Sequence, residues 1–117
     1  MKRPADFTHI LLYRHFTDMR KQILGLSSLV EELLPEYSLS KTLFVFCNRK
    51  KDIVKALYFD KAGFCLWTKK LDQSKFPWLK QALSQKHLTI SAQDMDLLLD
   101  GVDVFKRHKK LDFSSLS

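Results

Sequence analysis

The sequence is poor in residues that cross-link a chain or interrupt its regular structure. It has two cysteines, three glycines and three prolines among 117 residues. Both cysteines, Cys47 and Cys65, lie inside apolar runs, so we expect reduced thiols in a core and no disulfide. The glycines are isolated from one another, which excludes a glycine-rich loop that cradles phosphates.

Long hydrophobic runs are also missing. The longest uninterrupted apolar stretches have about six residues, whereas a membrane-spanning helix needs about 20. The opening stretch MKRPADF leads into no long apolar segment, so the pattern of a secretory signal is not evident. Together with the two expected free thiols, these features predict a cytoplasmic protein without membrane association.

Basic residues are in excess. Lysine and arginine number 20 against 13 aspartates and glutamates, which gives a formal net charge of +7 and an isoelectric point of about 9.5. Such an excess favours polyanionic partners such as DNA, RNA or an acidic membrane surface. Many small basic proteins bind no polyanion, so the positions of the charges matter more than their sum.

The pattern of apolar residues predicts a single α+β domain. We expect a small antiparallel β-meander sheet within residues 41–69, joined by a strand at 9–14. A long helix is expected at 19–34, packed on one face of the sheet. A shorter helix is expected at 91–100, and a further short helix after Trp78. The chain divides into a flexible basic lead at 1–8, the domain at 9–105, and a basic, then serine-rich tail at 106–117.

Local signals place the helix ends and the two faces of a hairpin. Thr17 or Asp18 is positioned to cap the first helix, and Ser91 to cap the second. Residues 53–60 and 63–69 read as two strands around a tight turn. Alternation along the second of these strands separates two sets of side chains, which are Phe64, Leu66 and Thr68 on one face and Cys65, Trp67 and Lys69 on the other.

No set of residues with the spacing of a catalytic or metal-binding site is evident, so we expect neither enzymatic activity nor a cofactor. The aspartates within residues 94–100 are explained by a helix cap and a solvated helix face. The four histidines have neither the helical spacing nor the cysteine partners of a metal site. One alternative stays open, in which Asp18, Asp60 and Asp72 converge in space as the metal ligands of a nuclease.

Nucleic-acid binding is better supported, because cations gather in the turns between the expected elements. Lysine dominates these clusters, which suits phosphate contact more than base recognition. The same distribution also fits an ordinary solvated surface. Two tryptophans near lysines are candidates for stacking on unpaired bases, although strand aromatics more often fill the core, and the loop residue Trp78 is expected to be the more exposed. The candidate contacts are Arg20, Lys21, Arg49, Lys50, Lys51, Lys69, Lys70, Trp67 and Trp78.

Five motifs, taken in order, resemble one protein family. They are TDMRK (17–21), LFVFCNRKKD (43–52), VKALYFDKAGFCLWTKKL (54–71), FPW (76–78) and LLLDGVD (97–103). Together they are similar to the small Orf2-like, TnpB-type accessory protein encoded by the second reading frame of a large class of bacterial insertion sequences. That protein is unrelated to the RNA-guided nuclease of the same label. The resemblance covers residues 9–105.

The resemblance implies a mobile-element protein that assists transposition beside a separate, larger transposase. It implies no enzymatic activity, and DNA association is the usual supposition for its role. The sequence departs from the family pattern at Phe16, Gln22, Phe59 and Lys70. At Lys70 the family frequently has arginine, so the charge is kept and the bidentate geometry is lost.

We therefore expect a non-catalytic accessory factor of transposition and DNA recombination that associates with DNA at the ends of the insertion sequence. The alternative is an adaptor that docks on the transposase or on another accessory protein of the element. Exposed aromatic residues such as Trp78 would then anchor the protein–protein contact.

Overall fold

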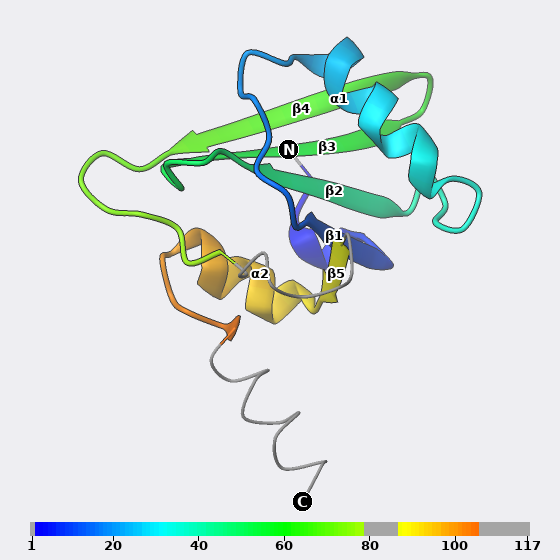
Figure 1. Cartoon of the computed structure of the whole chain (residues 1–117). Helices are drawn as coiled ribbons and strands as arrows, with labels where there is room; N and C mark the ends of the chain where they lie inside the picture. The colour runs from blue at the N-terminus through cyan, green and yellow to red at the C-terminus, as the bar shows by residue number, and fades with distance from the viewer. Residues whose placement is uncertain (1, 79–86, 106–117) are drawn as a thin grey trace, which may run out of the picture.

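The protein is a five-stranded sheet with one α-helix on each face (Figure 1). The computed structural model describes residues 2–78 and 87–105. Its α+β class agrees with the prediction. The elements are η1 (Pro4–Asp6), β1 (His9–Tyr13), α1 (Ile23–Val30), η2 (Glu31–Leu33), β2 (Thr42–Cys47), β3 (Ile53–Asp60), β4 (Gly63–Lys70), β5 (His87–Ile90) and α2 (Ala92–Leu99), where η marks a 3₁₀ helix.

The sheet is mixed, with the strand order β4-β3-β2-β1-β5. β1 and β2 run parallel, whereas the pairs β1–β5, β2–β3 and β3–β4 are antiparallel. The prediction of an antiparallel sheet is therefore right for β2, β3 and β4 and wrong for the sheet as a whole. The reason is the connection through α1, which returns the chain to β2 in the direction of β1, as a parallel pair requires.

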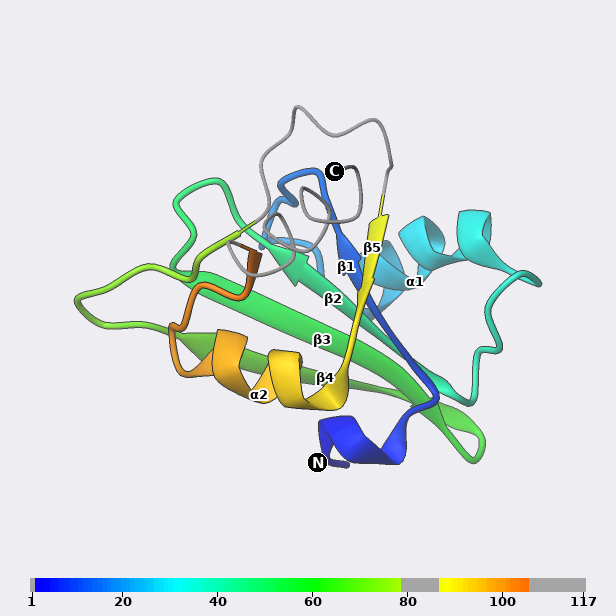
Figure 2. The same cartoon turned by 90° about the horizontal axis from the view of Figure 1, so that it is seen from below.

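Each face of the sheet has its own core, because neighbouring residues of a strand point to opposite faces. On β2, Val45 points to the face that α2 covers with Leu98, and Phe44 points to the face that α1 covers with Leu26. We call these the α2 core and the α1 core. Figure 2 shows the two helices on opposite sides of the sheet. All six residues of β2 are buried, as a continuous apolar run predicts.

The first helix is shorter than predicted. α1 and η2 together begin well after the start of the expected helix at 19–34. The N-cap residue is Gln22, whose side chain makes no capping hydrogen bond, so the prediction of a cap at Thr17 or Asp18 is wrong. The Asp18 carboxylate instead accepts a hydrogen bond from the backbone N–H of Arg20 at 2.9 Å. This local turn competes with the helix for the same backbone groups.

The hairpin follows the prediction, and every residue of β3 pairs with a residue of β4. Cys65 and Trp67 pack against the α2 core, and Phe64 and Leu66 pack against the α1 core, which confirms the expected alternation. The two aromatic side chains of β4, Phe64 and Trp67, thus help to attach this edge strand to the rest of the fold.

The second helix also has the predicted cap. The hydroxyl oxygen of Ser91 accepts a hydrogen bond from the backbone N–H of Asp94 at 3.0 Å. Past the other end of α2, Gly101 has a φ of +86°, in the left-handed region that glycine adopts readily. The sequence signals for both ends of this helix were therefore sufficient.

The segment before β1 packs onto the sheet. Pro4 is buried, and Phe7 belongs to the α2 core. The ring of Phe7 meets the ring of Tyr58 edge to face, with centroids 5.4 Å apart. Residues 2–8 thus make core contacts that a flexible lead at 1–8 does not have.

Two predictions, the short helix after Trp78 and the tail at 106–117, lie outside the described residues. In the described ranges 2–78 and 87–105, no helix has the length and apolar character needed to cross a bilayer.

Candidate nucleic-acid interface

The carboxyl ends of the parallel strands β1 and β2 meet at one edge of the sheet. The chain continues from β1 into residues 14–17 and from β2 into the turn at 48–52. The backbone N–H of Thr17 donates to the carbonyl oxygen of Cys47 at 2.9 Å, which holds the two segments side by side. Ligands of open α/β sheets bind outside the carboxyl ends of parallel strands, so this edge is the candidate site.

Asn48 shapes the turn between β2 and β3. Its side-chain oxygen accepts hydrogen bonds from the N–H groups of Asp52 and Ile53, at 3.1 and 3.0 Å. Its amide nitrogen donates to the Asp52 carboxylate at 2.6 Å, and this bond is the main cause that lowers the pKa of Asp52. Asp52 is thereby engaged in closing the turn, while Arg49 and Lys50 are exposed.

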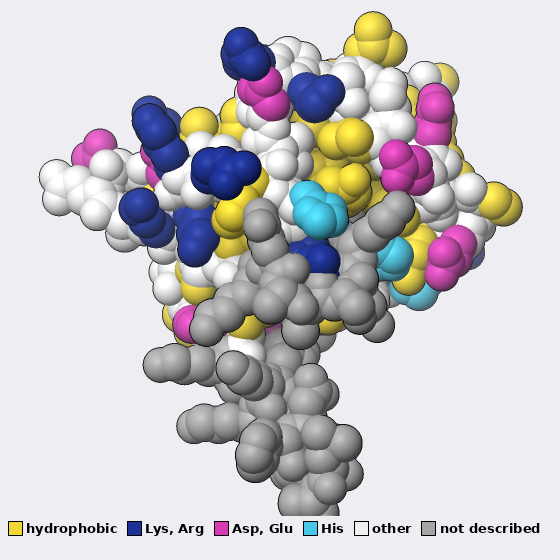
Figure 3. Space-filling view, viewed as in Figure 1, with side chains coloured by type: hydrophobic (Ala, Val, Ile, Leu, Met, Phe, Trp, Pro, Cys, Tyr) yellow, Lys and Arg dark blue, Asp and Glu magenta, His cyan; other side chains and the backbone are white. Residues whose placement is uncertain are grey.

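Lys70 joins this turn from the end of β4. It pairs across the hairpin with Ile53, and the next N–H, that of Leu71, donates to the carbonyl oxygen of Asp52 at 2.8 Å. The charges of Lys70 and Lys50 also help to lower the pKa of Asp52. Two of the predicted basic clusters are therefore brought together, and Figure 3 shows Lys and Arg side chains gathered over this end of the sheet.

Phe16 lies beneath two of the turn cations. The guanidinium carbon of Arg49 is 5.7 Å from the centre of the Phe16 ring, and the ammonium of Lys51 is 6.0 Å from it. Phe16 itself is half-buried and packs against the α2 core. Cation–π attraction thus holds both cations at the carboxyl edge of the sheet.

Arg20 and Lys21 lie in the segment before α1. The Arg20 guanidinium donates to the Asp18 carboxylate through Nε and Nη2, with a shortest distance of 2.6 Å. These bonds lower the pKa of Asp18 to about 2, so its charge offsets that of Arg20 across the physiological range. Lys21 is exposed and has no acidic partner among residues 2–78 and 87–105.

Two residues of β4 that were predicted to contact nucleic acid are engaged in the fold. The Lys69 ammonium donates to the carbonyl oxygen of Leu99, at the end of α2, at 2.8 Å. A cation at this position complements the carbonyl groups left free at a helix C-terminus. Trp67 is half-buried against the α2 core, so only part of its ring faces solvent.

Trp78 is buried, and the prediction that it is exposed is wrong. Its side chain is 6% exposed, and its indole N–H donates to the carbonyl oxygen of Tyr13 at 3.3 Å. The ring also meets that of Phe105, with centroids 6.5 Å apart. Although Trp78 lies in a loop, its apolar ring is buried against Phe105 and its single N–H donor is satisfied by the end of β1.

Sequence reasoning did not single out the structural role of Lys55. This lysine is 5% exposed, and its ammonium donates to the carbonyl oxygens of Met19 and Lys21, at 2.9 and 3.1 Å. It therefore ties the segment before α1 to the central strand β3. The available signal was its position between Ile53 and Leu57 on the α1-facing side of an otherwise apolar strand.

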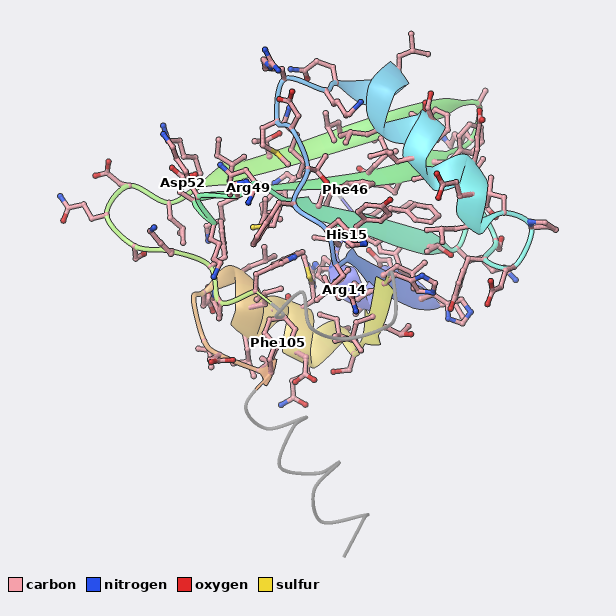
Figure 4. All side chains as sticks on the ribbon, in the orientation of Figure 1. Arg14, His15, Phe46, Arg49, Asp52 and Phe105 are labelled. Carbon is pink, nitrogen blue, oxygen red and sulfur yellow. The ribbon has the colours of Figure 1, made fainter. Side chains whose placement is uncertain are left out.

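Arg14 is the second residue that sequence reasoning missed. It follows β1 directly and is 6% exposed. The available signal was a charged residue at the end of the short apolar strand predicted at 9–14. Figure 4 shows Arg14 and His15 after β1 and Arg49 after β2, at the same end of the sheet.

Other chemistries receive no support from the described residues. Burial raises the pKa of the Cys47 thiol to about 12, so a reactive thiolate is disfavoured. Two of the three aspartates of the nuclease alternative are engaged elsewhere, Asp18 with Arg20 and Asp60 with Lys2 at 3.4 Å. Within ranges 2–78 and 87–105, no three His, Cys, Asp or Glu side chains gather as a set of metal ligands.

Comparison with known proteins identifies the family. The family model described as IS66 Orf2 like protein matches residues 8–109. The chain belongs to the IS66 Orf2-like family. This confirms the resemblance seen in the motifs and makes the chain an accessory protein associated with insertion sequences.

Two proteins of Sinorhizobium fredii (strain NBRC 101917 / NGR234) are similar to this IS66 Orf2-like chain. Protein y4hO is 36% identical over 87 residues, which cover 74% of each chain. Protein y4jC is 28% identical over 100 residues, which cover 86% of this chain and 84% of y4jC. Both are described as uncharacterized proteins. No solved structure matches the chain.

Proposed function

We propose that this IS66 Orf2-like protein is a non-catalytic accessory factor of transposition that associates with DNA in the bacterial cytoplasm, at the ends of the insertion sequence. The observation that carries the proposal is the group of cations around the β2–β3 turn. Arg49, Lys50, Lys51 and Lys70 gather there, and among residues 2–78 and 87–105 they form no ion pair. The carboxylate of the turn itself, that of Asp52, is held by Asn48.

The candidate contacts then fall into groups. The turn cations and Lys70 bind phosphates, and the exposed Lys21 extends this surface. Arg20 contributes less because Asp18 offsets its charge, and Lys69 contributes less because its ammonium already binds a carbonyl oxygen. Trp67 offers part of its ring for stacking, whereas the buried Trp78 does not. Because the free cations are mostly lysines, the proposal is phosphate contact with little base recognition.

Fluorescence anisotropy with DNA from the ends of the element, at several salt concentrations, tests the proposal. Each phosphate contact contributes about −0.9 to the slope of log K against log salt for duplex DNA. The double variant Lys50→Gln/Lys51→Gln is expected to bind more weakly and to lose about 2 from the steepness of that slope.

The matched control is Lys41→Gln/Lys61→Gln. It removes the same charge from two exposed lysines at the opposite ends of β2 and β3. This control is expected to keep the slope of the unmodified protein to within about 1. Undetectable binding at low salt, a flat salt dependence, or equal effects of the two doubles would contradict phosphate contact at the turn.

An adaptor role is the second candidate, and the outer side of α1 favours it. Leu24 is 82% exposed and Ile23 is 39% exposed, next to each other at the start of the helix. Exposed apolar side chains of this size are candidates for a protein contact, for instance with the transposase or another accessory protein. In nuclease-treated lysate, an adaptor captures the transposase, and Leu24→Gln reduces that capture. A contact bridged by DNA disappears on nuclease treatment instead.

A further inference from the structure

Arg14 has an unusual environment for an arginine. Its side chain is 6% exposed, and its Nε and Nη1 atoms are buried without a hydrogen-bond partner. Nearly all buried polar groups of proteins are hydrogen-bonded, and an unpaired buried donor is costly, most of all on a charged group. A guanidinium held in this way is prepared for a partner that brings its own acceptor atoms.

The position of Arg14 points to an external ligand. It leaves β1 at the carboxyl end of the parallel β1–β2 pair, where ligands of α/β sheets bind. Two residues later, Phe16 carries the cations Arg49 and Lys51 over its ring. Arg14 and Phe16 both belong to the short segment that leaves β1 at this end of the sheet. The edge thus combines one recessed and two more accessible cations.

No carboxylate of the described residues forms an ion pair with Arg14, Arg49 or Lys51. The ion pairs within ranges 2–78 and 87–105 are Lys2–Asp60 and Arg20–Asp18. Asp52, the acid in the neighbouring turn, is hydrogen-bonded to Asn48 and keeps its negative charge, which offsets one of the three cations of that turn, Arg49, Lys50 and Lys51. The local field is therefore positive and favours a ligand with more than one negative charge.

We propose that Arg14, with Arg49 and Lys51, binds a phosphate monoester. A phosphate group presents several acceptor oxygens to the planar fork of an arginine, and a monoester carries close to two negative charges. The recessed position of Arg14 selects a phosphate that projects from the end of a molecule. A phosphodiester inside a duplex strand reaches the exposed Arg49 and Lys50 instead. The site takes inorganic phosphate, a nucleotide or a terminal phosphate of DNA, and only the last of these rests on the proposed function.

The test compares two DNA oligonucleotides that differ only in their 5′ end, one phosphorylated and one with a free hydroxyl group. In anisotropy titrations the phosphorylated DNA is expected to bind about tenfold more tightly, as an added charge-assisted bidentate pair predicts. Arg14→Met is expected to remove this preference while keeping binding of the hydroxyl-ended DNA. Arg14→Lys keeps the charge and is expected to restore only part of the preference.

Lys41→Met is the control, because it removes an exposed cation just before β2, at the other end of the strand. It is expected to leave the preference unchanged. A parallel measurement needs no variant: the Nε–H NMR signal of Arg14 is followed while inorganic phosphate or a nucleoside 5′-monophosphate is added. A saturable shift of that signal supports the site even if Arg14→Met fails to fold.

The outcomes separate this proposal from the proposed function. Equal binding of the two DNA ends, with no shift of the Arg14 signal, overturns the phosphate site and leaves DNA association standing. A saturable shift with phosphate or nucleotide, but no DNA binding, supports the site and contradicts DNA association. No DNA binding and no shift contradict both.

Discussion

Two basic segments start side by side in the structure and use their charges in different ways. In the TDMRK segment, residues 17–21, the Asp18 carboxylate binds Arg20, and Lys55 reaches in from β3 to hold two backbone carbonyl oxygens. In the NRKKD turn, residues 48–52, the acid and the amide bind each other and leave the cations unpaired. Charged side chains hold the backbone of the TDMRK segment in place, whereas the cations of the NRKKD turn take part in no ion pair.

The difference shows that the partner of an acid decides the role of the neighbouring cations. Asp18 lies two residues before an arginine and pairs with it, so the charges of Asp18 and Arg20 offset each other and Lys21 is the unpaired cation of the segment. Asp52 lies four residues after an asparagine, whose amide and carbonyl groups close the turn without using a cation. Both segments have an Asp and several basic residues, and composition alone does not separate them.

The largest effect is expected from Lys55→Met. The methionine keeps most of the buried stem but removes the donor to the carbonyl oxygens of Met19 and Lys21. We expect the free energy of unfolding to fall by about 2–4 kcal/mol, because two charge-assisted hydrogen bonds are lost. Urea unfolding followed by circular dichroism measures this change.

The control for this variant is Lys50→Met, which makes the same change at an exposed turn cation. Its free energy of unfolding is expected to change by less than about 0.5 kcal/mol. If both variants lose the same stability, the segment at 17–21 is not held by Lys55, and the contrast between the two segments fails.

Asn48→Ala is expected to have the next largest effect. It removes the acceptor for two backbone N–H groups and the donor to the Asp52 carboxylate. We expect a loss of about 1–3 kcal/mol in the free energy of unfolding, and a rise in the pKa of Asp52 because its main hydrogen bond is gone. Denaturant unfolding and carboxyl NMR titration measure the two effects. An unchanged pKa of Asp52 would show that Asn48 does not organise the turn.

The sequence predicts elements that depend on local signals. Alternation identifies the two faces of β4, and the Ser91 cap and Gly101 mark the ends of α2. It does not predict the parallel pairing of β1 and β2, because that pairing depends on the path of the chain through α1. The start of α1 is misjudged for a related reason: Met19 fits the apolar periodicity, but its carbonyl oxygen is held by Lys55, 36 residues away.

The candidate site is predictable to a similar degree. The basic turn is evident in the letters RKK. The structure adds Lys70 to it, because the pairing of β3 with β4 places Lys70 opposite Ile53, next to the turn. The sequence does not show that Trp78 is buried, since its partners Tyr13 and Phe105 are distant along the chain. The recessed Arg14 is hidden for the same reason, because burial at a strand end depends on what the fold brings over it.

A smaller effect on DNA affinity distinguishes the two segments, provided that the protein binds DNA as proposed. Arg49→Gln removes an unpaired cation and is expected to weaken binding about three- to tenfold at low salt and to reduce the salt slope by about 1. Asp18→Asn/Arg20→Gln removes both members of an ion pair and leaves the net charge unchanged. Its affinity is expected to stay within about twofold of the unmodified protein. Equal losses for both variants would show that the paired Arg20 contributes to DNA binding as much as the unpaired Arg49 does.

The smallest expected effect is in the titration of the two aspartates. The folded-state pKa of Asp18 is about 2, below its ordinary value of 3.8, so the stabilisation by its charge is present above pH 3.8 and is lost as the pH falls through about 2. Because the Arg20 side chain is the largest cause, Arg20→Gln is expected to raise the pKa of Asp18 while the backbone N–H of residue 20 keeps it below 3.8.

Arg49→Gln is expected to leave the pKa of Asp52 unchanged, since Asn48, Lys70 and Lys50 lower it and Arg49 does not. Carboxyl NMR titration of both variants decides between a paired and an unpaired arginine in each segment, and a matching rise at Asp52 would show that Arg49 is paired after all.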